Sequence, residues 1–220
     1  MRPVGDGSRS GSDEGLLIFL VRHGETPWHA ENRYCGRTDL PLTERGREQA
    51  EGLARWAADV GVAAVHSSTL TRARETAAGA ARAAGVPHHV DPRLVELDFG
   101  LAEGHTPAEM RQRWPAERAA FERDPVAHPL PGGEDPKAAM ARGAAGLDDI
   151  VRAHPGGPVL VVCHGTLLRL LTCCLTGIDP SRYRDRFPKV ANTSGAVLRA
   201  PLSHDGRWKL LDFNPSLSTS

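Results

Sequence analysis

The sequence predicts a single α/β domain of three layers, in which a mixed, mainly parallel sheet is flanked by helices. Short apolar runs alternate along the chain with segments of helical periodicity, a pattern typical of parallel sheets with crossover helices. The length of 220 residues suits one ordinary domain with a sizeable core. The sequence shows no internal repeat and no dividing linker, so we expect one domain over residues 15–213.

The first half of the chain predicts two long strand–helix units. Residues 16–21 form a continuous apolar run, which is typical of a central strand covered on both faces. Thr43 is a plausible N-cap for the helix that follows. The apolar positions of that helix fall on one face: Ala50, Leu53, Ala54 and Ala57. Residues 62–65 predict the next strand, and the alanine-rich segment 71–84, closed by Gly85, predicts the next helix.

The second half predicts further elements of both kinds. Residues 159–163 are the clearest buried strand, and a helix over 167–175 follows it. A helical stretch over 107–124 is interrupted by Pro115. The remaining expected elements are a short strand at 88–91, a loop at 129–133, a helix over 135–153, and a terminal hairpin of residues 195–200 and 208–211 at the sheet edge.

The two ends of the chain differ in composition from the centre. Residues 1–14 are rich in Gly, Ser and Asp and lack an apolar stretch, so we expect a disordered lead-in and not a signal peptide. We expect the serine-rich residues 214–220 to form a loose tail. No segment is long and apolar enough to predict a transmembrane helix.

Charge and cysteine content narrow the possible partners. Lys+Arg and Asp+Glu are equal at 27 each, so no general partnership with nucleic acid or an anionic membrane is expected. Any anion must be bound locally by a few arginines. The four cysteines have the spacing of neither a zinc site nor a disulfide framework, which indicates reduced thiols in the cytoplasm. The sequence does not determine whether the chain forms homo-oligomers.

The tandem histidines His88 and His89 raise the question of a metal site. Neighbouring residues of a strand point to opposite faces, and the sequence shows no further ligand beside them. We therefore expect ordinary residues here and no metal.

Reactive side chains follow three of the predicted strands. Arg22 and His23 follow the first strand, Arg72 follows Ser67 and Ser68, and His164 follows the strand 159–163. Ligands of open α/β sheets bind beyond the carboxyl ends of the strands. We therefore expect these side chains to converge on one crevice.

The residue types at these strand ends suit phosphoryl transfer. A neutral imidazole such as that of His23 is a competent nucleophile at pH 7, because its usual pKa is about 6.5. Arg72, at the start of a helix, can offer a bidentate fork to a phosphate. His164 can donate to the oxygens of the transferring group. A single strand-end histidine more often caps a turn or lies satisfied in the core, but the combination favours the catalytic interpretation.

A proton donor is also required. Cleavage of a phosphate monoester needs a proton for the leaving oxygen and then a base for water, and one carboxylate can serve both steps in turn. The segment 96–104 contains three candidates: Glu96, Asp98 and Glu103. The residues alone leave the choice open.

Two strings of residues carry a family resemblance. Leu20–Trp28, which contains Arg-His-Gly, and the segment 36–46 resemble the signature of the histidine phosphatase superfamily, also called phosphoglycerate mutase-like, and further matches run to about Asn192. Within the superfamily, the chain resembles the phosphatase branch, with bacterial proteins of the fructose-2,6-bisphosphatase and α-ribazole phosphatase type. The resemblance implies that His23 is phosphorylated, that Arg72 is the second phosphate-binding arginine, and that Glu96 is the proton donor. It implies the same fold and no metal or cofactor.

The resemblance also defines an expected phosphate-binding set, with two departures. His29 stands where relatives usually carry Asn, and Cys35 stands where they often carry Gln. That Asn helps to hold the phosphoryl group, so His29 is expected either to donate a similar hydrogen bond or to line the mouth of the site. The expected set is Arg22, His29, Cys35, Gly36, Arg72, His164 and Gly165.

The expected function is hydrolysis of a small phosphorylated metabolite, such as a sugar or cyclitol phosphate, through a phosphohistidine on His23. One alternative is a cofactor-dependent phosphoglycerate mutase, and another is a binding module without catalysis. At the position of residues 96–100, mutases carry a pattern that looks like Glu-Arg-His-Tyr-Gly, whereas this chain has Glu-Leu-Asp-Phe-Gly. This chain also lacks the longer basic insert of the mutases. Side chains expected to shape the pocket also include Trp28, Tyr34, Arg37, His105, Trp114 and Phe121.

Overall fold

A computed structural model describes residues 15–154, 156–201 and 206–217. The expected lead-in over residues 1–14 lies outside the described residues. Within the described part, no helix combines the length and the apolar character that crossing a membrane requires.

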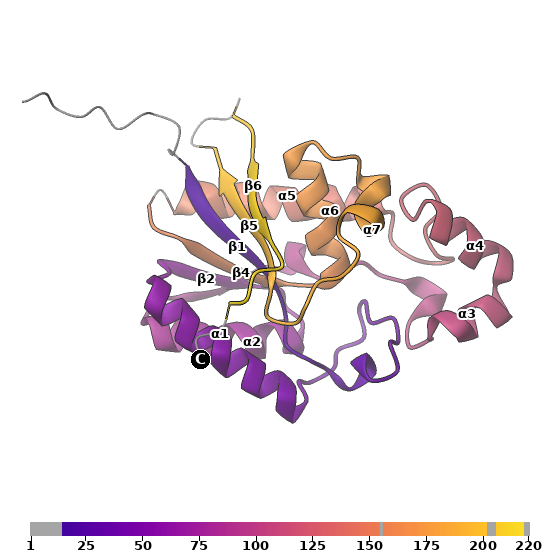
Figure 1. Ribbon diagram of the computed structural model, residues 1–220, viewed down its shortest axis with the longest axis horizontal. Coiled ribbons are helices and arrows are strands. Elements are labelled where there is room, and N and C mark those ends of the chain that lie inside the picture. The colour runs from indigo at the N-terminus through magenta and orange to yellow at the C-terminus, as the bar shows by residue number, and fades with distance from the viewer. Residues whose placement is uncertain (1–14, 155, 202–205, 218–220) are drawn as a thin grey trace, which may run out of the picture.

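A six-stranded mixed sheet forms the centre of the molecule, as predicted (Figure 1). The strand order is β3-β2-β4-β1-β5-β6. The first four strands in that order pair in parallel. β5 pairs antiparallel with β1, and β6 pairs antiparallel with β5. The bounds are β1 Leu16–Arg22, β2 Ala64–Ser67, β3 His88–Val90, β4 Val159–Cys163, β5 Gly195–Ala200 and β6 Lys209–Phe213.

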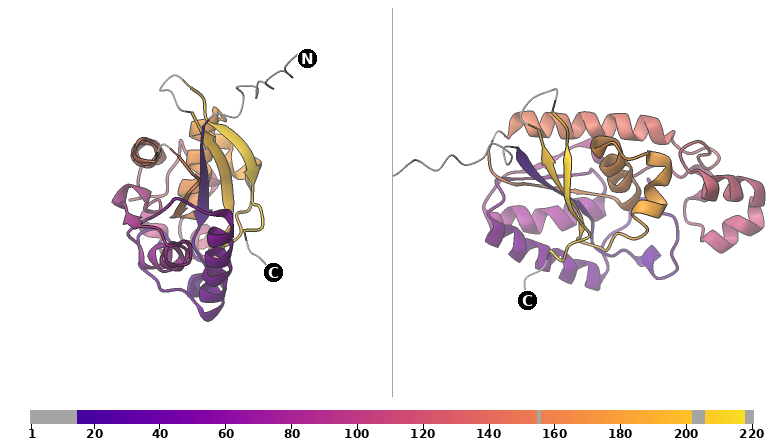
Figure 2. Two further views of the ribbon diagram at one scale, coloured as in Figure 1. Left: turned by 90° about the vertical axis from the view of Figure 1, so that its left-hand side faces the viewer. Right: turned by 45° about the horizontal axis from the view of Figure 1, so that its top comes forward.

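Helices cover both faces of the sheet, which explains the continuous apolar runs (Figure 2). Along β1, Ile18 and Leu20 point to the face covered by α5 (Pro136–Ala153) and α6 (Gly165–Thr176). Phe19 and Val21 point to the other face, where α1 (Glu44–Val60) and α2 (Thr71–Ala84) pack. The core therefore lies in two layers, one on each side of the sheet.

Two short helices extend the molecule at one end (Figure 1). They are α3 (Pro107–Arg113) and α4 (Pro115–Arg123), separated at Trp114 as the proline predicts. The remaining helical turns are η1 Pro27–His29, η2 Pro92–Leu94, η3 Gly100–Ala102, η4 Pro180–Arg182 and α7 Tyr183–Arg186.

Element boundaries differ from the sequence expectation at a few ends. The second strand begins at Ala64 because Gly61 ends α1 in the left-handed conformation and Val62 still donates to the carbonyl of Ala57. The helix after β4 begins at Gly165 and not at Leu167, since His164 is already its N-cap. This earlier start places backbone N–H groups directly beside the strand ends.

The described part of the expected loose tail is anchored. Asn214 donates its backbone N–H to the Gly195 carbonyl, and Ser194 Oγ donates to the Pro215 carbonyl. Leu217 is buried in the core layer between α1, α2 and the sheet. The serine-rich composition concealed this one apolar contact, and residues 218–220 lie outside the described residues.

Candidate active site

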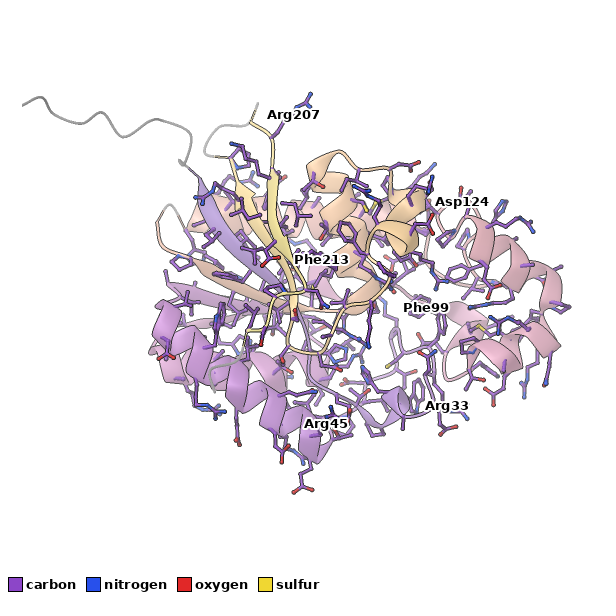
Figure 3. All side chains as sticks on the ribbon, viewed as in Figure 1. Arg33, Arg45, Phe99, Asp124, Arg207 and Phe213 are labelled. Carbon is purple, nitrogen blue, oxygen red and sulfur yellow. The ribbon has the colours of Figure 1, made fainter. Side chains whose placement is uncertain are left out.

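The sheet brings the three predicted strand ends together. Strands β2, β4 and β1 are neighbours, with Ser67 opposite Val162 and Cys163 opposite Arg22 in register. Arg22, His23 and Glu96 line a cleft of about 590 Å³ that opens beside this edge. Figure 3 shows Arg33 and Phe99, which also line the cleft, on the side of the sheet toward α3 and α4.

His23 has the geometry of a neutral nucleophile. The side chain is only 5% exposed, and its Nδ1 lies 2.7 Å from the Gly24 carbonyl oxygen. That oxygen can only accept, so the ring proton is assigned to Nδ1 and the lone pair to Nε2. Nε2 accepts a 3.1 Å bond from Arg72 Nε. Burial, Arg72 and Arg22 hold the pKa of His23 well below its usual value, so the imidazole is neutral at pH 7.

Gly24 is required by the tight passage of the chain beyond His23. A Cβ at this position would lie 2.5 Å from the carbonyl oxygen of Gly46, at the start of α1. The backbone N–H of Gly24 donates to Thr76 Oγ1 of α2. These contacts fix the carbonyl that holds the His23 proton.

Arg22 lies opposite the nucleophile, with its guanidinium held from two sides. Nη1 donates to the Val190 carbonyl at 2.8 Å, and Nη2 lies 2.7 Å from His29 Nε2. Burial, with smaller contributions from Arg169 and Arg72, lowers the pKa of Arg22 to about 10, which leaves it charged at neutral pH. Its Nε is buried and has no hydrogen-bond partner among the described residues.

His29 contacts Arg22 and does not point a free donor into the cleft. Its Nε2 lies near two donors, Arg22 Nη2 at 2.7 Å and the amide of Asn192 at 3.3 Å. Its Nδ1 accepts from the Thr26 N–H at 3.0 Å and also lies beside Thr26 Oγ1. Both ring nitrogens are therefore engaged by the protein. Burial and the charge of Arg22 lower the pKa of His29 to about 4. Of the two roles that the sequence left open, this geometry fits support of Arg22 at the cleft wall.

His164 provides the second orphaned nitrogen. Its Nε2 lies 2.8 Å from Ser68 Oγ, and that hydroxyl also accepts from the Leu70 N–H. The His164 Nδ1 atom is buried without a partner in the described part of the chain, and its ring lies 5.2 Å from that of His23 between centroids. Arg22 Nε and His164 Nδ1 therefore share one property: each is a buried polar atom that the protein leaves unsatisfied.

Arg72 is fully buried, and its fork is already engaged. Nη1 donates to the Thr38 carbonyl at 2.8 Å and Nη2 to the Gly36 carbonyl at 2.7 Å. Sequence reasoning expected a free bidentate fork, but in this structure only Nε is directed at His23. The loop over residues 35–38 thus fixes the Arg72 charge beside the nucleophile.

Glu96 lies at the N-terminus of α6 and is 4% exposed. Its Oε2 accepts from the Thr166 N–H at 2.8 Å, and its Oε1 accepts from the N–H groups of Leu97 and Leu167. Glu96 also lines the cleft. Asp98 Oδ1 instead accepts from Gly100 N–H, and Glu103 binds the loop at Thr38. Only the first of the three candidate acids therefore faces the reaction site.

The other predicted phosphate-binding residues occupy supporting positions. Cys35 and Gly165 line the cleft. Gly36 gives its carbonyl to Arg72, and a Cβ there would collide with Glu103 and Leu97. Burial raises the pKa of Cys35 to about 11, so its thiol stays protonated. A Cβ at Gly165 would lie 3.3 Å from the buried Arg22 Nε, so glycine leaves space beside this nitrogen.

The sequence analysis missed a basic wall of the cleft. Its residues come from α4, α6, α7 and the segment before β5: Arg118, Arg169, Arg184 and Lys189. Arg118 pairs with Glu122, whereas Arg169 and Arg184 bind only carbonyl and phenol oxygens and form no ion pair within the described residues. The three arginines lie in ordinary helices and Lys189 in the segment before β5, so no local pattern distinguishes them. Trp28 and Tyr34 line the cleft as expected, but Arg37, His105, Trp114 and Phe121 do not.

One cluster outside the cleft has the residue types of a metal site. His89, for which the sequence showed no partner, lies beside His66 and His154. No local pattern in the sequence indicates these neighbours, because strand pairing and the end of α5 bring histidines that are distant in sequence to His89.

Comparison with known proteins places this geometry in a family. The profile of the histidine phosphatase superfamily (branch 1) matches residues 18–215. The probable phosphoglycerate mutase GpmB of Enterobacter sp. (strain 638) is 34% identical over 179 residues, covering 81% of this chain and 82% of the relative. The corresponding protein of Cronobacter sakazakii is 35% identical over 182 residues, with the same coverage.

Solved structures agree in fold. A mycobacterial glucosyl-3-phosphoglycerate phosphatase in complex with VO3 superposes with a TM-score of 0.84 at 28% identity, covering 91% of this chain and 100% of that one. The α-ribazole phosphatase of Shigella flexneri gives 0.78 at 27% identity, covering 93% and 98%. The chain belongs to the histidine phosphatase superfamily, as its two strings of motif residues predict, and it is an enzyme of the phosphoric monoester hydrolase type.

Proposed function

We propose that the chain hydrolyses a small phosphorylated metabolite through a phosphohistidine on His23. The observation that carries this proposal is the pair of orphaned buried nitrogens, Arg22 Nε and His164 Nδ1, beside a neutral imidazole whose Nε2 carries a lone pair. Unsatisfied buried polar groups are costly unless a ligand completes them. A phosphoryl group has oxygens of the right charge for both positions.

In the first step the hydrogen bond donated by the Arg72 Nε–H passes from His23 Nε2 to an oxygen of the bound phosphoryl group. The freed lone pair of Nε2 attacks phosphorus, and the bond from phosphorus to the ester oxygen breaks. Arg22, Arg72 and His164 stabilise the charge on the phosphoryl oxygens. The Ser68 hydroxyl, whose oxygen accepts from the Leu70 N–H, donates a hydrogen bond to His164 Nε2, so the ring proton of the neutral His164 stays on Nδ1 and Nδ1–H serves as a donor. Glu96 gives its proton to the departing alkoxide, and the Gly24 carbonyl holds the proton on His23 Nδ1 throughout.

In the second step water attacks the phosphohistidine. The Glu96 carboxylate takes a proton from the water, the phosphorus–nitrogen bond breaks, and inorganic phosphate leaves. His23 returns to its neutral form and Glu96 to its protonated form. Dividing one difficult displacement between two easier ones is the advantage of covalent catalysis.

Water is the acceptor that we favour over a sugar acid, although the two groups of similar proteins point in different directions. The curated relatives carry the name of a probable mutase, whereas the solved structures include phosphatases, one of them in complex with inorganic phosphate. The segment Glu96–Gly100 lacks the Arg-His-Tyr sequence that is typical of mutases at this position. That local difference supports hydrolysis.

The test is to trap the intermediate. Acid-labile, alkali-stable phosphoryl-enzyme should form when the protein is mixed with a labelled phosphomonoester and quenched with alkali, and inorganic phosphate should follow. His23→Ala should abolish both, while the exposed His128→Ala should behave as wild type. A wild-type protein that forms no phosphoryl-enzyme and releases no phosphate would contradict the proposal and favour a binding module. Transfer to an added phosphoglycerate in preference to water would favour the mutase.

The basic wall supports a substrate with a second anionic group. Arg169 and Arg184 line the same cleft as His23, and their side chains bind only neutral oxygens of the protein. Burial lowers the pKa of Arg169, and the charge of Arg184 adds to this, while Glu96 acts in the opposite direction. A carboxylate or second phosphate on the metabolite would neutralise both arginines.

Kinetics on two substrates distinguish binding of a second anionic group by Arg184 from phosphoryl transfer at His23. Arg184→Ala should raise KM about tenfold or more for a phosphorylated sugar acid, while changing kcat/KM for p-nitrophenyl phosphate by less than about threefold, because a lost charged hydrogen bond costs about 1.5–3 kcal/mol. Arg186→Ala, on the same short helix but outside the cleft, is the matched control. Equal effects on both substrates would remove the second anion from the proposal.

The four free cysteines fit the reducing cytoplasm as the place where the enzyme acts.

A further inference from the structure

We propose that His66, His89 and His154 form a binding site for a divalent transition-metal ion of the zinc type, separate from the phosphoryl-transfer cleft. One ring nitrogen of each histidine lies within 4.8 Å of the others. None of the three lines the cleft. The inference does not depend on the proposed function.

The fold brings the three rings to one face of the sheet. His66 on β2 is paired in register with His89 on β3, so both side chains point the same way. Their rings stack at 4.8 Å between centroids with 26° between planes. His154 is the C-cap of α5, which covers this face, and its ring meets that of His66 edge-on at 5.1 Å.

The distances are close to those of a coordinated set. Zinc binds imidazole nitrogen at about 2.0–2.1 Å, so two ligand nitrogens of one tetrahedral ion lie roughly 3.4 Å apart. His66 Nε2 and His154 Nε2 are 2.9 Å apart. The widest separation in the trio, up to 4.8 Å, would close through a small rotation of the exposed His89 side chain. His66 is buried and fixes the base of the site.

The hydrogen bonding of the cluster is incomplete without a ligand. The 2.9 Å contact can be a single N–H to N hydrogen bond between His66 and His154. In the part of the chain that the structure describes, the His89 ring then has no hydrogen-bond partner; it stacks on His66 and lies 6.1 Å from the His154 ring between centroids. His88 differs, since it points to the other face and bonds Ser67 Oγ at 2.8 Å. A metal ion would satisfy all three rings at once.

Two of the three rings, those of His66 and His154, are held in the neutral form that binds metals. Burial, with the nearby His89 and His154, lowers the pKa of His66 to about 4, and burial also lowers that of His154. Metal ligation requires neutral imidazole, so little proton displacement is needed at pH 7. The negative charge of Asp91 raises the pKa of His66 and so opposes part of this shift. Arg93 forms ion pairs with both Asp91 and Asp149.

The donor set indicates the class of metal. Three imidazoles suit Zn²⁺, Cu²⁺ and Ni²⁺ and not Mg²⁺ or Ca²⁺, which prefer oxygen ligands. Asp91 and Asp149 are engaged by Arg93, so the fourth position of a tetrahedral ion would fall to water on the exposed side of His89. A site with three protein ligands and one open position follows.

Zinc titration of the full chain tests the proposal. After treatment with a chelator and its removal, wild-type protein should bind Zn²⁺ in competition with a chromophoric chelator, and Zn²⁺ should raise the midpoint of thermal unfolding. His89→Ala and His154→Ala should each weaken binding at this site at least tenfold and abolish the thermal shift. Both residues are at least partly exposed, so these variants are expected to fold. His88→Ala, a neighbour on the opposite face, is the matched control and should bind as wild type.

The cleft also contains histidines, so the experiment must distinguish the two places. A loss of zinc binding in His89→Ala, with the rate of phosphate release from p-nitrophenyl phosphate unchanged, is the expected result. Zinc binding that is lost only in His23→Ala would place the metal in the cleft and overturn the proposal. Equal zinc affinity in wild type, His89→Ala and His154→Ala would overturn it as well.

Discussion

At the scale of single residues, the position of one proton decides what His23 can do. The Gly24 carbonyl holds the proton on Nδ1, and burial beside two arginines keeps the ring neutral, so Nε2 is available as a nucleophile. His164 and Arg22 each have one buried side-chain nitrogen without a hydrogen-bond partner among the described residues. Glu96 differs from them, since three backbone N–H groups hold it at the start of α6.

The role of Glu96 as proton donor predicts a dependence on the leaving group. Glu96→Gln should lower kcat/KM for an alkyl phosphate by about 10²–10⁴-fold, because the departing alkoxide needs a proton. The effect on p-nitrophenyl phosphate should be much smaller, since p-nitrophenolate leaves without one. Steady-state kinetics on both substrates provide the ratio, which is insensitive to any loss of folded protein. An equal loss on both would assign Glu96 a structural role at the N-terminus of α6.

At the scale of elements, the helix pairs on the two faces of the sheet differ in whether a glycine at their contact can be replaced by alanine. Gly79 of α2 faces α1, where an added Cβ would lie 3.6 Å from the Ala54 Cβ, an ordinary contact. Gly143 of α5 faces α6, where an added Cβ would lie 3.0 Å from both methyl carbons of the buried Leu171. Both glycines cost helix stability relative to alanine, but only one has room for a methyl group.

These two glycines predict substitutions of opposite sign. Gly79→Ala should stabilise the protein by about 0.5–1 kcal/mol through helix propensity. Gly143→Ala should destabilise it by about 1 kcal/mol, because overpacking costs about 1–3 kcal/mol and outweighs the same propensity gain. Urea unfolding at one pH measures both. A stabilising Gly143→Ala would show that α5 and α6 separate easily.

At the scale of the whole molecule, buried neutral histidines make stability depend on pH. The pKa values of His23 and His164 lie well below the usual 6.5, mainly through burial, and those of His29 and His66 lie at about 4. In the unfolded chain all four rings titrate near 6.5. Between that value and the lower folded values, the unfolded state binds more protons than the folded one.

The free energy of unfolding should therefore fall as pH is lowered from 7 to 5. Each excess proton on the unfolded chain contributes about 1.4 kcal/mol per pH unit in this window. The midpoint of urea unfolding should decrease over this range, with an unchanged slope on denaturant concentration. A midpoint that stays constant or rises would mean that these rings are protonated in the folded state. The range stops at pH 5 so that carboxylate titration contributes little.

The sequence by itself determined the sheet and the position of the principal reactive groups. Apolar runs such as 16–21 and 159–163 require cover on both faces, and residues that follow parallel strands must meet at one edge. Arg22, His23 and His164 were predicted at that edge for this reason. The helix 71–84, the break at Pro115 and the strand 195–200 were also predicted correctly, because local signals mark them.

Only the tertiary structure decided how these groups are held and what surrounds them. The carbonyl that fixes the His23 proton, the loop that engages the fork of Arg72 and the support of Arg22 by His29 depend on side-chain directions that no local pattern encodes. The basic wall of the cleft and the cluster of His66, His89 and His154 join segments distant in sequence. Periodicity reports which face a residue occupies, whereas contact between distant faces is set by packing of the whole chain.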